Sequence, residues 1–445
     1  MAKDMTKGSS AKLLIDFAVP MMLGNIFQQL YNLVDTLIVG RCLGTKELAA
    51  VGATGNIISF MVSLIFGLSI GAGIVIAQYY GAGNFNKMKK AIVSIVYIIT
   101  ALTLLISVAG VLFAPAILHI LQVPKEIFSD ALLYLRICIS LIFGMTVYNG
   151  AAAILRSIGD SSTPFIAVLV SSTIHVILNL IFVLVFHMGV AGVALGTVIS
   201  QAISALICIR HIARCQRELS LENIEWKPDQ EMIRTIIRIG APNALQSSLI
   251  AVGGMSVQGL VNSFGTDTMA AYTTVLRIDS VSIQVVVGLA TALSVFTGQN
   301  IGSGNFDRIK KALHQTLAMM MVSSFCLALL VVIFRRQLLS LFLDPVTAAA
   351  SIDIGCTYMT IIGIAYVIAG VMNSYLNVIR GAGDVNVALI AGIAEVCGRI
   401  FFAYLLVGKF GTTGIWIATP LSWGCGCLIP VLRYYTGKWK RMNLV

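Results

Sequence analysis

One acidic residue, Asp35, interrupts an apolar run that carries no other charge back to Asp16. On a helix with 100° per residue, Asn25, Gln28, Asn32 and Asp35 follow spacings of three, four and three residues, which places all four on one narrow face. An ionised carboxylate inside lipid costs several kcal/mol, so this face must contact protein or water. A carboxyl group in that setting can take up and release a proton, or bind a cation in the proton's place.

The direction of the chain adds to this expectation. With the N-terminus inside, Asp35 falls in the outer part of its helix, near the negative end of the helix dipole, and that end disfavours an anion. Burial disfavours the charged form as well. We therefore expect an exchange site for a proton or a cation; the alternative is an interfacial aspartate that extends to water or caps its neighbours.

Candidate partners of this acid occur in later apolar runs. His175 and Asn179 are four residues apart and share one face of a helix. Thr197 in the sixth run, with Tyr148 and Asn149 in the fourth, completes the expected polar lining. A histidine satisfied within the core, and ordinary hydrogen bonds between helices for the other residues, are the structural alternatives.

The elements that position these residues are predicted from composition. Of 445 residues, 58% are hydrophobic and only 11% are charged, whereas roughly a quarter of the residues in globular proteins are charged. Stretches of the ~20 apolar residues needed to cross a bilayer recur along the chain, and each must be helical because lipid offers the backbone no other partner. We predict an all-α integral membrane protein with twelve spans: 13–39, 49–79, 91–114, 131–155, 164–186, 189–210, 234–263, 268–299, 312–334, 353–379, 385–407 and 412–435.

The basic surplus is interpreted as a topology signal. The net charge is +11, and with twelve spans most Lys and Arg residues fall on the side that holds both termini. The positive-inside rule then places both termini in the cytoplasm of a cell whose inner membrane holds the protein. We expect no nucleic-acid partner and no cleavable signal, since the first apolar run is too long for one. The Lys and Arg residues assigned to the opposite side are Arg41, Lys46, Lys125, Arg136, Arg335, Arg336 and Lys409.

An internal repeat is the most specific feature of the sequence. "QYYGAGNFNKMKKA" at 78–91 returns as "QNIGSGNFDRIKKA" at 299–312, and "RSIGD" at 156–160 returns as "RGAGD" at 380–384. Pro20 likewise matches Pro242. Six spans per half leave both halves in the same orientation, so the repeat is parallel. We predict an N-terminal six-helix lobe, residues 1–216, and a C-terminal six-helix lobe, residues 217–445.

These motifs resemble the multidrug and toxic-compound extrusion (MATE) family of secondary transporters. The resemblance covers the whole chain and includes "AVPMMLGNIFQQLYNLVDTLIVGRCLG" in the first helix, "ILRSIGD" closing the fourth and "IRGAGD" closing the tenth. It implies export of organic cations in exchange for protons or sodium, through a cavity that opens between the lobes to each side in turn. It also implies no cofactor besides the coupling ion.

The resemblance bears on the partners of Asp35 too. Family members usually have an amide at the position of His175 and an acid or amide at that of Asn179. Asn179 fits that pattern, but His175 departs from it, and imidazole is a poor ligand for a hard cation. His175 instead offers a second proton acceptor. A bend at Pro20 is expected to move Asp35 between two settings.

The second lobe is charged differently from the first. The position that aligns with Asp35 is near Val257, so no matching acid is present. Its expected buried charges are Arg277 and Asp279 in the eighth helix and Glu395 and Arg399 in the eleventh. Glu395 and Arg399 are four residues apart, which favours an ion pair; whether these charges have a structural or a functional role is open at this stage.

The sequence thus predicts a cation-coupled exporter of amphipathic organic cations, expected to be a monomer, with small molecules and membrane lipid as its partners. Asn25, Gln28, Asn32, Tyr148 and Asn149 are the predicted substrate cavity. The alternative is a flippase for lipids or lipid-linked oligosaccharides. An enzyme is not expected, because no nucleophile-base pair or metal cluster is found in the spans. The nine scattered cysteines show no metal-ligand spacing, which leaves sodium at the first-helix acid as the one metal ion considered.

Overall fold

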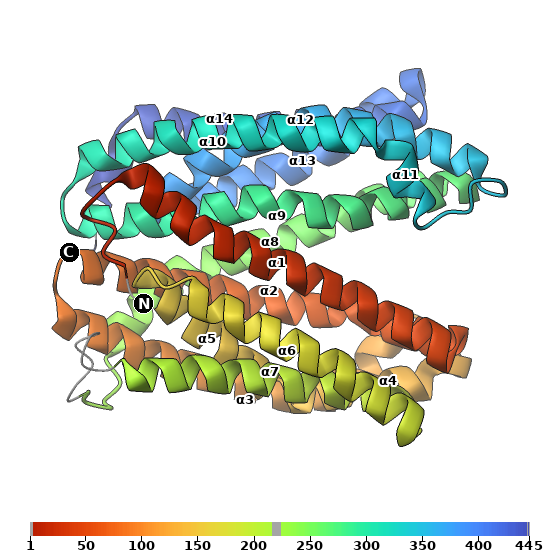
Figure 1. Cartoon of the computed structure of the whole chain (residues 1–445), viewed down its shortest axis with the longest axis horizontal. Coiled ribbons are helices and arrows are strands. Elements are labelled where there is room, and N and C mark those ends of the chain that lie inside the picture. The colour runs from red at the N-terminus through yellow and green to blue at the C-terminus, as the bar shows by residue number, and fades with distance from the viewer. Residues whose placement is uncertain (1–2, 216–223, 443, 445) are drawn as a thin grey trace. The chain divides into compact units, whose positions relative to one another are not determined.

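The computed structural model describes residues 3–215, 224–442 and 444, and these residues form helices and short connections with no strand. Figure 1 shows the helices as long rods with short turns between them. The elements are α1 (Ser10–Ile38), the π-helix η1 (Val39–Leu43), α2 (Thr45–Gly81), α3 (Phe85–Ile120), α4 (Lys125–Ser140), α5 (Phe143–Ser157), α6 (Ser162–Leu180), the π-helix η2 (Ile181–Val185), α7 (Gly189–Arg214), α8 (Gln230–Asn262), α9 (Thr266–Gly302), α10 (Phe306–Ile333), α11 (Arg335–Ser340), α12 (Ala349–Gly381), α13 (Val385–Phe410), α14 (Thr412–Tyr435) and the 3-10 helix η3 (Lys438–Arg441).

The predicted membrane spans are present as helices. Among the described residues, 10 helices are long and apolar enough to cross a membrane, and the pair α4 and α5 raises the number to 11. The expected seventh span corresponds to α8, which has 33 residues but begins with the charged residues Glu231, Arg234 and Arg238. With α8 included, each of the twelve predicted spans corresponds to a described helix or, for the fourth, to the pair α4 and α5.

The fourth predicted span, 131–155, is a broken helix. It divides between Ser140 and Phe143 into α4 and α5, which are bent by 44°. Gly144 lies just after this break, and a Cβ atom there would come within 2.8 Å of the backbone nitrogen of Ala202 on α7. Helix α5 therefore approaches α7 closely just after the bend.

The described chain divides into two compact units. The first unit comprises Met1–Asp4 and Leu23–Ala244, and the second comprises Met5–Met22 and Leu245–Val445. Two of the three changeovers, after Met22 and after Ala244, lie two residues after the repeat-related prolines Pro20 in α1 and Pro242 in α8. The lobe boundary predicted between residues 216 and 217 lies outside the described residues.

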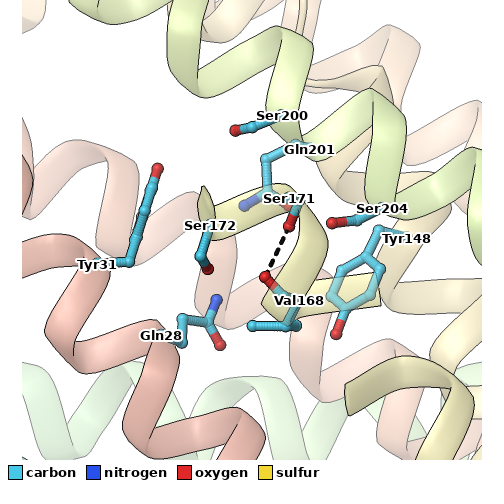
Figure 2. Close-up of a pocket in the computed structure, with 9 residues that line it drawn as sticks. All are labelled: Gln28, Tyr31, Tyr148, Val168, Ser171, Ser172, Ser200, Gln201 and Ser204. Atoms are coloured by element: carbon cyan, nitrogen blue, oxygen red, sulfur yellow. Dashed lines mark hydrogen bonds between the residues drawn. The ribbon is translucent and has the colours of Figure 1, made fainter. Parts of the chain in front are cut away.

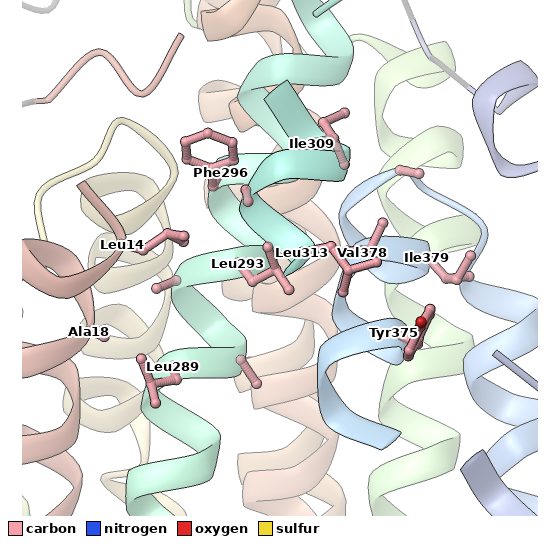
Figure 3. Close-up of a cluster of buried hydrophobic side chains, with 14 of the residues drawn as sticks. Leu14, Ala18, Leu289, Leu293, Phe296, Ile309, Leu313, Tyr375, Val378 and Ile379 are labelled. Carbon is pink, nitrogen blue, oxygen red and sulfur yellow. The ribbon is translucent and has the colours of Figure 1, made fainter. Parts of the chain in front are cut away.

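Each unit has its own apolar core. In the first unit, α2, α3, α4 and the start of α5 enclose a cluster that includes Ile65, Leu118 and Leu135. In the second unit, the first half of α1 packs with α9, α10 and α12; Figure 3 shows Leu14 and Phe296 among the side chains of this cluster. Long apolar helices that bury a face against one another in this way hold the polar residues of α1, α6 and α7 at fixed places.

Candidate functional site

The polar residues of α1, α6 and α7 meet in the first unit. Asn179 Nδ2 donates a hydrogen bond to Asp35 Oδ1 at 2.6 Å, and His175 Nε2 lies 3.9 Å from the same oxygen. Thr197 Oγ1 lies 3.2 Å from His175 Nε2. The four residues predicted from the sequence as a coupling group therefore form one connected cluster, although their roles stay a proposal.

The partners of Asp35 are more deeply buried than the acid itself. His175 and Asn179 are both 0% exposed, whereas the Asp35 side chain keeps 16% of its surface exposed. His175 Nδ1 and Asn179 Oδ1 are buried without a hydrogen-bond partner among the described residues. The amide nitrogen of Asn179 faces the carboxylate. The amide oxygen lies beside Gly196 on α7, where an added Cβ atom would come within 2.0 Å of it.

Helices α1 and α6, which carry Asp35 and Asn179, each turn from α-helix into π-helix shortly after these residues. The π-helix η1 begins at Val39, four residues after Asp35, and η2 begins at Ile181, two residues after Asn179. Val39 and Val183, one from each π-helix, belong to the same buried cluster. π-turns inside helices occur frequently at functional sites, and here two of them lie next to the residues that share a hydrogen bond.

A small polar cavity adjoins this cluster inside the first unit. Its volume is about 10 Å³, which is room for about one water molecule. Figure 2 shows Gln28 extending from α1 and Gln201 extending from α7 toward Ser171 and Ser172 on α6. The ring of Tyr31, also at the cavity, lies 4.2 Å from the ring of His175 between centroids. The lining residues are Gln28, Tyr31, Tyr148, Val168, Ser171, Ser172, Ser200, Gln201 and Ser204.

The predicted substrate-cavity residues divide into two groups. Gln28 and Tyr148 line the polar cavity. Asn149 instead donates its amide to the carbonyl of Met145 in its own helix at 2.8 Å. Asn25 is half-buried and Asn32 is exposed, and neither lines that cavity. One narrow helix face thus carries residues with different surroundings.

Several residues of the site were missed in the sequence. Tyr31 precedes Asp35 by four residues, and Ser171 precedes His175 by the same spacing. Ser200 and Ser204 continue one face of α7 from Gly196 at intervals of four. These spacings were available signals, but short hydroxyl side chains are common in membrane helices and do not mark a site by themselves.

The second unit holds a separate polar cluster. Tyr366 on α12 donates its hydroxyl to Asp279 Oδ1 on α9 at 2.7 Å. The expected ion pair on α13 is present, with Arg399 Nη2 donating to Glu395 Oε1 at 2.9 Å. Arg277 was expected to be a buried charge, but this was wrong: its side chain is exposed. Arg277 and Asp279 are two residues apart, so they point to different faces of α9.

Aromatic rings in the second unit stack on one another. The centroids of Tyr358 and Trp416 are 4.4 Å apart, and Tyr272 lies 5.6 Å from Trp416. These rings, from α9, α12 and α14, belong to a large apolar cluster of the second unit. The interior of the second unit around these rings is therefore closely packed.

Comparison with known proteins identifies the chain. The MatE family model matches residues 20–181 and again residues 242–405, one match in each half. The chain belongs to the MATE family. The two matches also confirm the internal repeat, and MATE proteins are transporters, so this chain is a multi-pass membrane transporter.

Named MATE relatives and solved structures match nearly the whole chain. The probable multidrug resistance protein YpnP of Bacillus subtilis is 29% identical over 100% of this chain and 99% of its own length. The multidrug export protein MepA of Staphylococcus haemolyticus is 26% identical over 96% of this chain and 94% of its own. A solved outward-facing conformation of a multidrug resistance MATE family transporter of the MOP superfamily has a TM-score of 0.90 at 22% identity, covering 98% of both chains. This likeness confirms the MATE fold.

Proposed function

We propose that the chain exports amphipathic organic cations in exchange for protons, with Asp35 as the exchange group. The observation that carries this proposal is the cluster in which Asp35 contacts Asn179 on α6, next to His175 and Thr197. An ionisable group among membrane helices is functional in most transporters. Four polar residues gathered from three separate helices are more than a single interhelical hydrogen bond requires.

The donor set favours a proton over sodium as the coupling ion. Sodium, a hard cation, prefers oxygen ligands, but two of the groups nearest the carboxylate of Asp35 present nitrogen: Asn179 Nδ2 and His175 Nε2. The oxygen of the Asn179 amide faces Gly196 instead. The amide N–H stabilises the ionised carboxylate, and a proton that arrives neutralises it without any new ligand.

Exchange follows from the competition between two positive charges for one carboxylate. Ionised Asp35 attracts a cationic cargo, whereas protonated Asp35 has no charge to offer and releases it. The polar cavity beside Tyr31 and Gln28 has room for about one water molecule.

Hydrophobic cations are the cargo that the charges favour. The membrane helices contain the acids Asp35, Asp279 and Glu395, while Arg399 is already paired with Glu395. Relatives named multidrug resistance and multidrug export proteins agree with such cargo. We further propose that the protein works as a monomer by alternating access, in the inner cell membrane, with both termini in the cytoplasm.

Transport by reconstituted protein tests the proposal. Purified full-length protein in sealed vesicles receives an imposed pH gradient in one arm and a sodium gradient in the other, with a fluorescent hydrophobic cation as cargo. Uphill movement of the dye under the pH gradient alone, and its loss in Asp35→Asn, is the expected result. Movement driven by sodium alone would reject proton coupling. Movement of labelled anionic lipid with no movement of cationic dyes would favour the flippase instead.

A further inference from the structure

The chain that leads into α1 is held in the second unit by the turn between α9 and α10. Met5 is fully buried. Its backbone N–H donates to Gln299 Oε1 at 2.8 Å, and its carbonyl accepts from Asn300 Nδ2 at 3.1 Å. Arg308 Nη2 donates to the same carbonyl at 3.2 Å, and Arg308 Nη1 donates to the carbonyl of Gly8 at 2.9 Å. We call this set of contacts, which lies within the second unit, the N-terminal clasp.

The side chains of the clasp are themselves held in place. Gln299 and Asn300 belong to the last turn of α9, and both are fully buried. Asn300 Oδ1 accepts from Arg308 Nε at 3.1 Å, and the guanidinium carbon lies 5.6 Å from the ring centroid of Phe296, an attractive cation–π contact. A guanidinium presents five N–H donors in a rigid fork, and here the fork reaches three separate acceptors. The clasp is therefore a built recess for a short segment of backbone.

The first half of α1 continues this attachment along α9. Four of its apolar residues follow helical spacing and are buried in one cluster with side chains of α9: Leu14, Phe17, Ala18 and Met21. Figure 3 shows Leu14 and Ala18 in this cluster. A Cβ atom on Gly288 of α9 would come within 3.1 Å of the backbone nitrogen of Met22. From the clasp to Met22, the chain is thus packed on α9.

The second half of α1, which carries Asp35, packs on a different helix. The residues from Leu23 onward belong to the first unit. A Cβ atom on Gly24 would lie 3.6 Å from the ring of Phe165 on α6. Asp35 accepts its hydrogen bond from Asn179, which is also on α6. One continuous helix is therefore attached to α9 by its first half and to α6 by its second half.

We propose that the N-terminal clasp anchors the first half of α1 to α9, and that Arg308 is thereby a positioning residue for coupling, because a movement of α9 is passed along α1 to Asp35. This inference rests on the proposed function of Asp35. The acid lies about 20 Å along the helix axis from Met22, at 1.5 Å per residue. A helix passes a displacement over that distance only if both of its halves are held. Without the clasp, α1 follows α9 less closely, and proton exchange at Asp35 loses its link to cargo movement.

The first unit carries different side chains at the matched positions of the repeat. Lys87 stands where Arg308 stands, and Tyr79 stands where Asn300 stands. The ammonium nitrogen of Lys87 is exposed and lies 5.5 Å from the ring centroid of Tyr79. Lys87→Gln is therefore a matched control, since it removes one positive charge at the same place in the repeat but outside the clasp.

Hydrogen exchange of the purified full-length protein in detergent tests the anchor. The Met5 N–H is buried and hydrogen-bonded, so an N-terminal peptide that contains Met5 should exchange slowly in the wild type. Arg308→Gln removes the bonds to two backbone carbonyls. Exchange in this peptide should become faster by roughly tenfold or more, as expected when hydrogen bonds from a charged donor are lost. Arg308→Lys should give an intermediate rate, and Lys87→Gln should match the wild type.

Two kinds of dye uptake by the protein in sealed vesicles then test the positioning role. Accumulation of a fluorescent hydrophobic cation against its own gradient, driven by an imposed pH gradient, requires coupling. Exchange of labelled for unlabelled dye without a pH gradient does not. Arg308→Gln should accumulate roughly tenfold less dye per folded protein, while its gradient-free exchange stays close to that of the wild type. A loss of stability alone would lower both kinds of uptake in proportion.

A second variant covers the case in which Arg308→Gln does not fold. Gly8 has a φ of +81°, a conformation that suits glycine, so Gly8→Ala strains the turn whose carbonyl Arg308 binds. It should change both measurements in the same direction and to a smaller extent.

Each outcome bears on a separate part of the proposal. Unchanged N-terminal hydrogen exchange in Arg308→Gln and Gly8→Ala would overturn the anchor. Faster exchange with unchanged dye accumulation, or with equal losses of both kinds of uptake, would overturn the positioning role. A wild-type protein with a protected N-terminal peptide but no accumulation under the pH gradient would reject the proposed function and leave the anchor standing.

Discussion

At matched positions of the repeat, the first unit carries His175 and Asn179 where the second carries Arg399 and Ala403. The first pair surrounds an acid, Asp35. In the second unit the position of that acid is close to Val257, and Arg399 is permanently charged and bonded to Glu395 at 2.9 Å. The same helical scaffold thus holds the proposed exchange group in one unit and a fixed ion pair in the other.

The two units also differ at the position that contacts Asn179 in the first unit. Gly196 lies against Asn179 in the first unit. The corresponding residues of the second unit are Ala418 and Ala403, both fully buried in one apolar cluster. A glycine is present where an amide must fit, and a methyl group fills the space where the amide is missing. The comparison indicates that the first unit is shaped around Asn179.

Replacing the buried aspartate of each unit, Asp35 or Asp279, with asparagine should give the largest difference in export rate between the two units. Asp35→Asn keeps the shape and the hydrogen bonds of the side chain but cannot change its charge, so gradient-driven export should fall to the level of protein-free vesicles. Asp35→Glu should retain part of it. The matched control is Asp279→Asn, which should leave most of the export rate in place. Full export by Asp35→Asn, with a well-folded but uncoupled Asp279→Asn or Glu395→Gln, would move the exchange site to the second unit.

A methyl group at position 196 should give the next largest effect. Gly196→Ala places its Cβ atom on Asn179 Oδ1, so the amide must turn away from Asp35. Loss of a charge-assisted hydrogen bond worth about 1.5–3 kcal/mol should lower the export rate by roughly tenfold or more. The control is Gly55→Ala on α2, where a Cβ atom meets nothing within 4 Å. Initial rates of dye uptake at equal protein content check this, and equal rates for the two variants would remove Gly196 from the site.

Much of this comparison was accessible from the sequence, because it depends on regular periodicity. The repeat, the membrane helices and the face of α1 that carries Asp35 follow from spacing alone. The ion pair between Glu395 and Arg399 was also expected, since it lies within one helix. The partners Asn179 and His175 were found through their shared helix face and through the resemblance to the MATE family.

Contacts between helices that are distant in sequence were beyond that reasoning. Tyr31 over His175 and the hydroxyl of Tyr366 on Asp279 depend on how helices are rotated about their axes, and spacing leaves that rotation undetermined. The exposure of Arg277 was mispredicted for the same reason. The break before α5 contains no proline that would have predicted it, and Gly144, which follows it, approaches α7 closely.

Breaking the fixed ion pair of the second unit should affect stability rather than coupling. Glu395→Gln leaves Arg399 without its carboxylate, and removing one member of a buried pair costs about 3–5 kcal/mol. Arg399 keeps 18% of its side chain exposed, so about 3 kcal/mol is expected. The melting temperature in detergent should drop clearly, while the protein that remains folded should still couple export to the pH gradient. The double variant Glu395→Gln/Arg399→Met should recover most of the loss, because no charge is then stranded; failure to recover would show that the pair does more than hold the helices.

The smallest expected effect concerns the starts of α8 and α1. In the first unit, Asp229 caps α8 by accepting the N–H of Met232 at 3.0 Å and pairs with Lys90 at 3.0 Å. In the second unit, Arg308 instead donates to the backbone carbonyl of Gly8 at 2.9 Å, an acceptor that does not titrate. The backbone hydrogen bond from Met232, and next the Lys90 ammonium, lower the pKa of Asp229 below its usual value.

A lowered pKa in the folded protein means that the cap stabilises at neutral pH and that this contribution is lost as the pH falls through the folded-state value. Asp229→Ala should therefore cost about 1 kcal/mol at pH 7, as loss of a helix cap does. The melting temperatures of variant and wild type should converge in acid, below about pH 4. Asp307→Ala is the control, because Asp307 is 97% exposed in its pair with Lys310 and such surface pairs contribute little. A constant difference between Asp229→Ala and wild type across the whole pH range would mean that the first unit is not held at this end by a titratable group. The contrast with the second unit would then be confined to the exchange site.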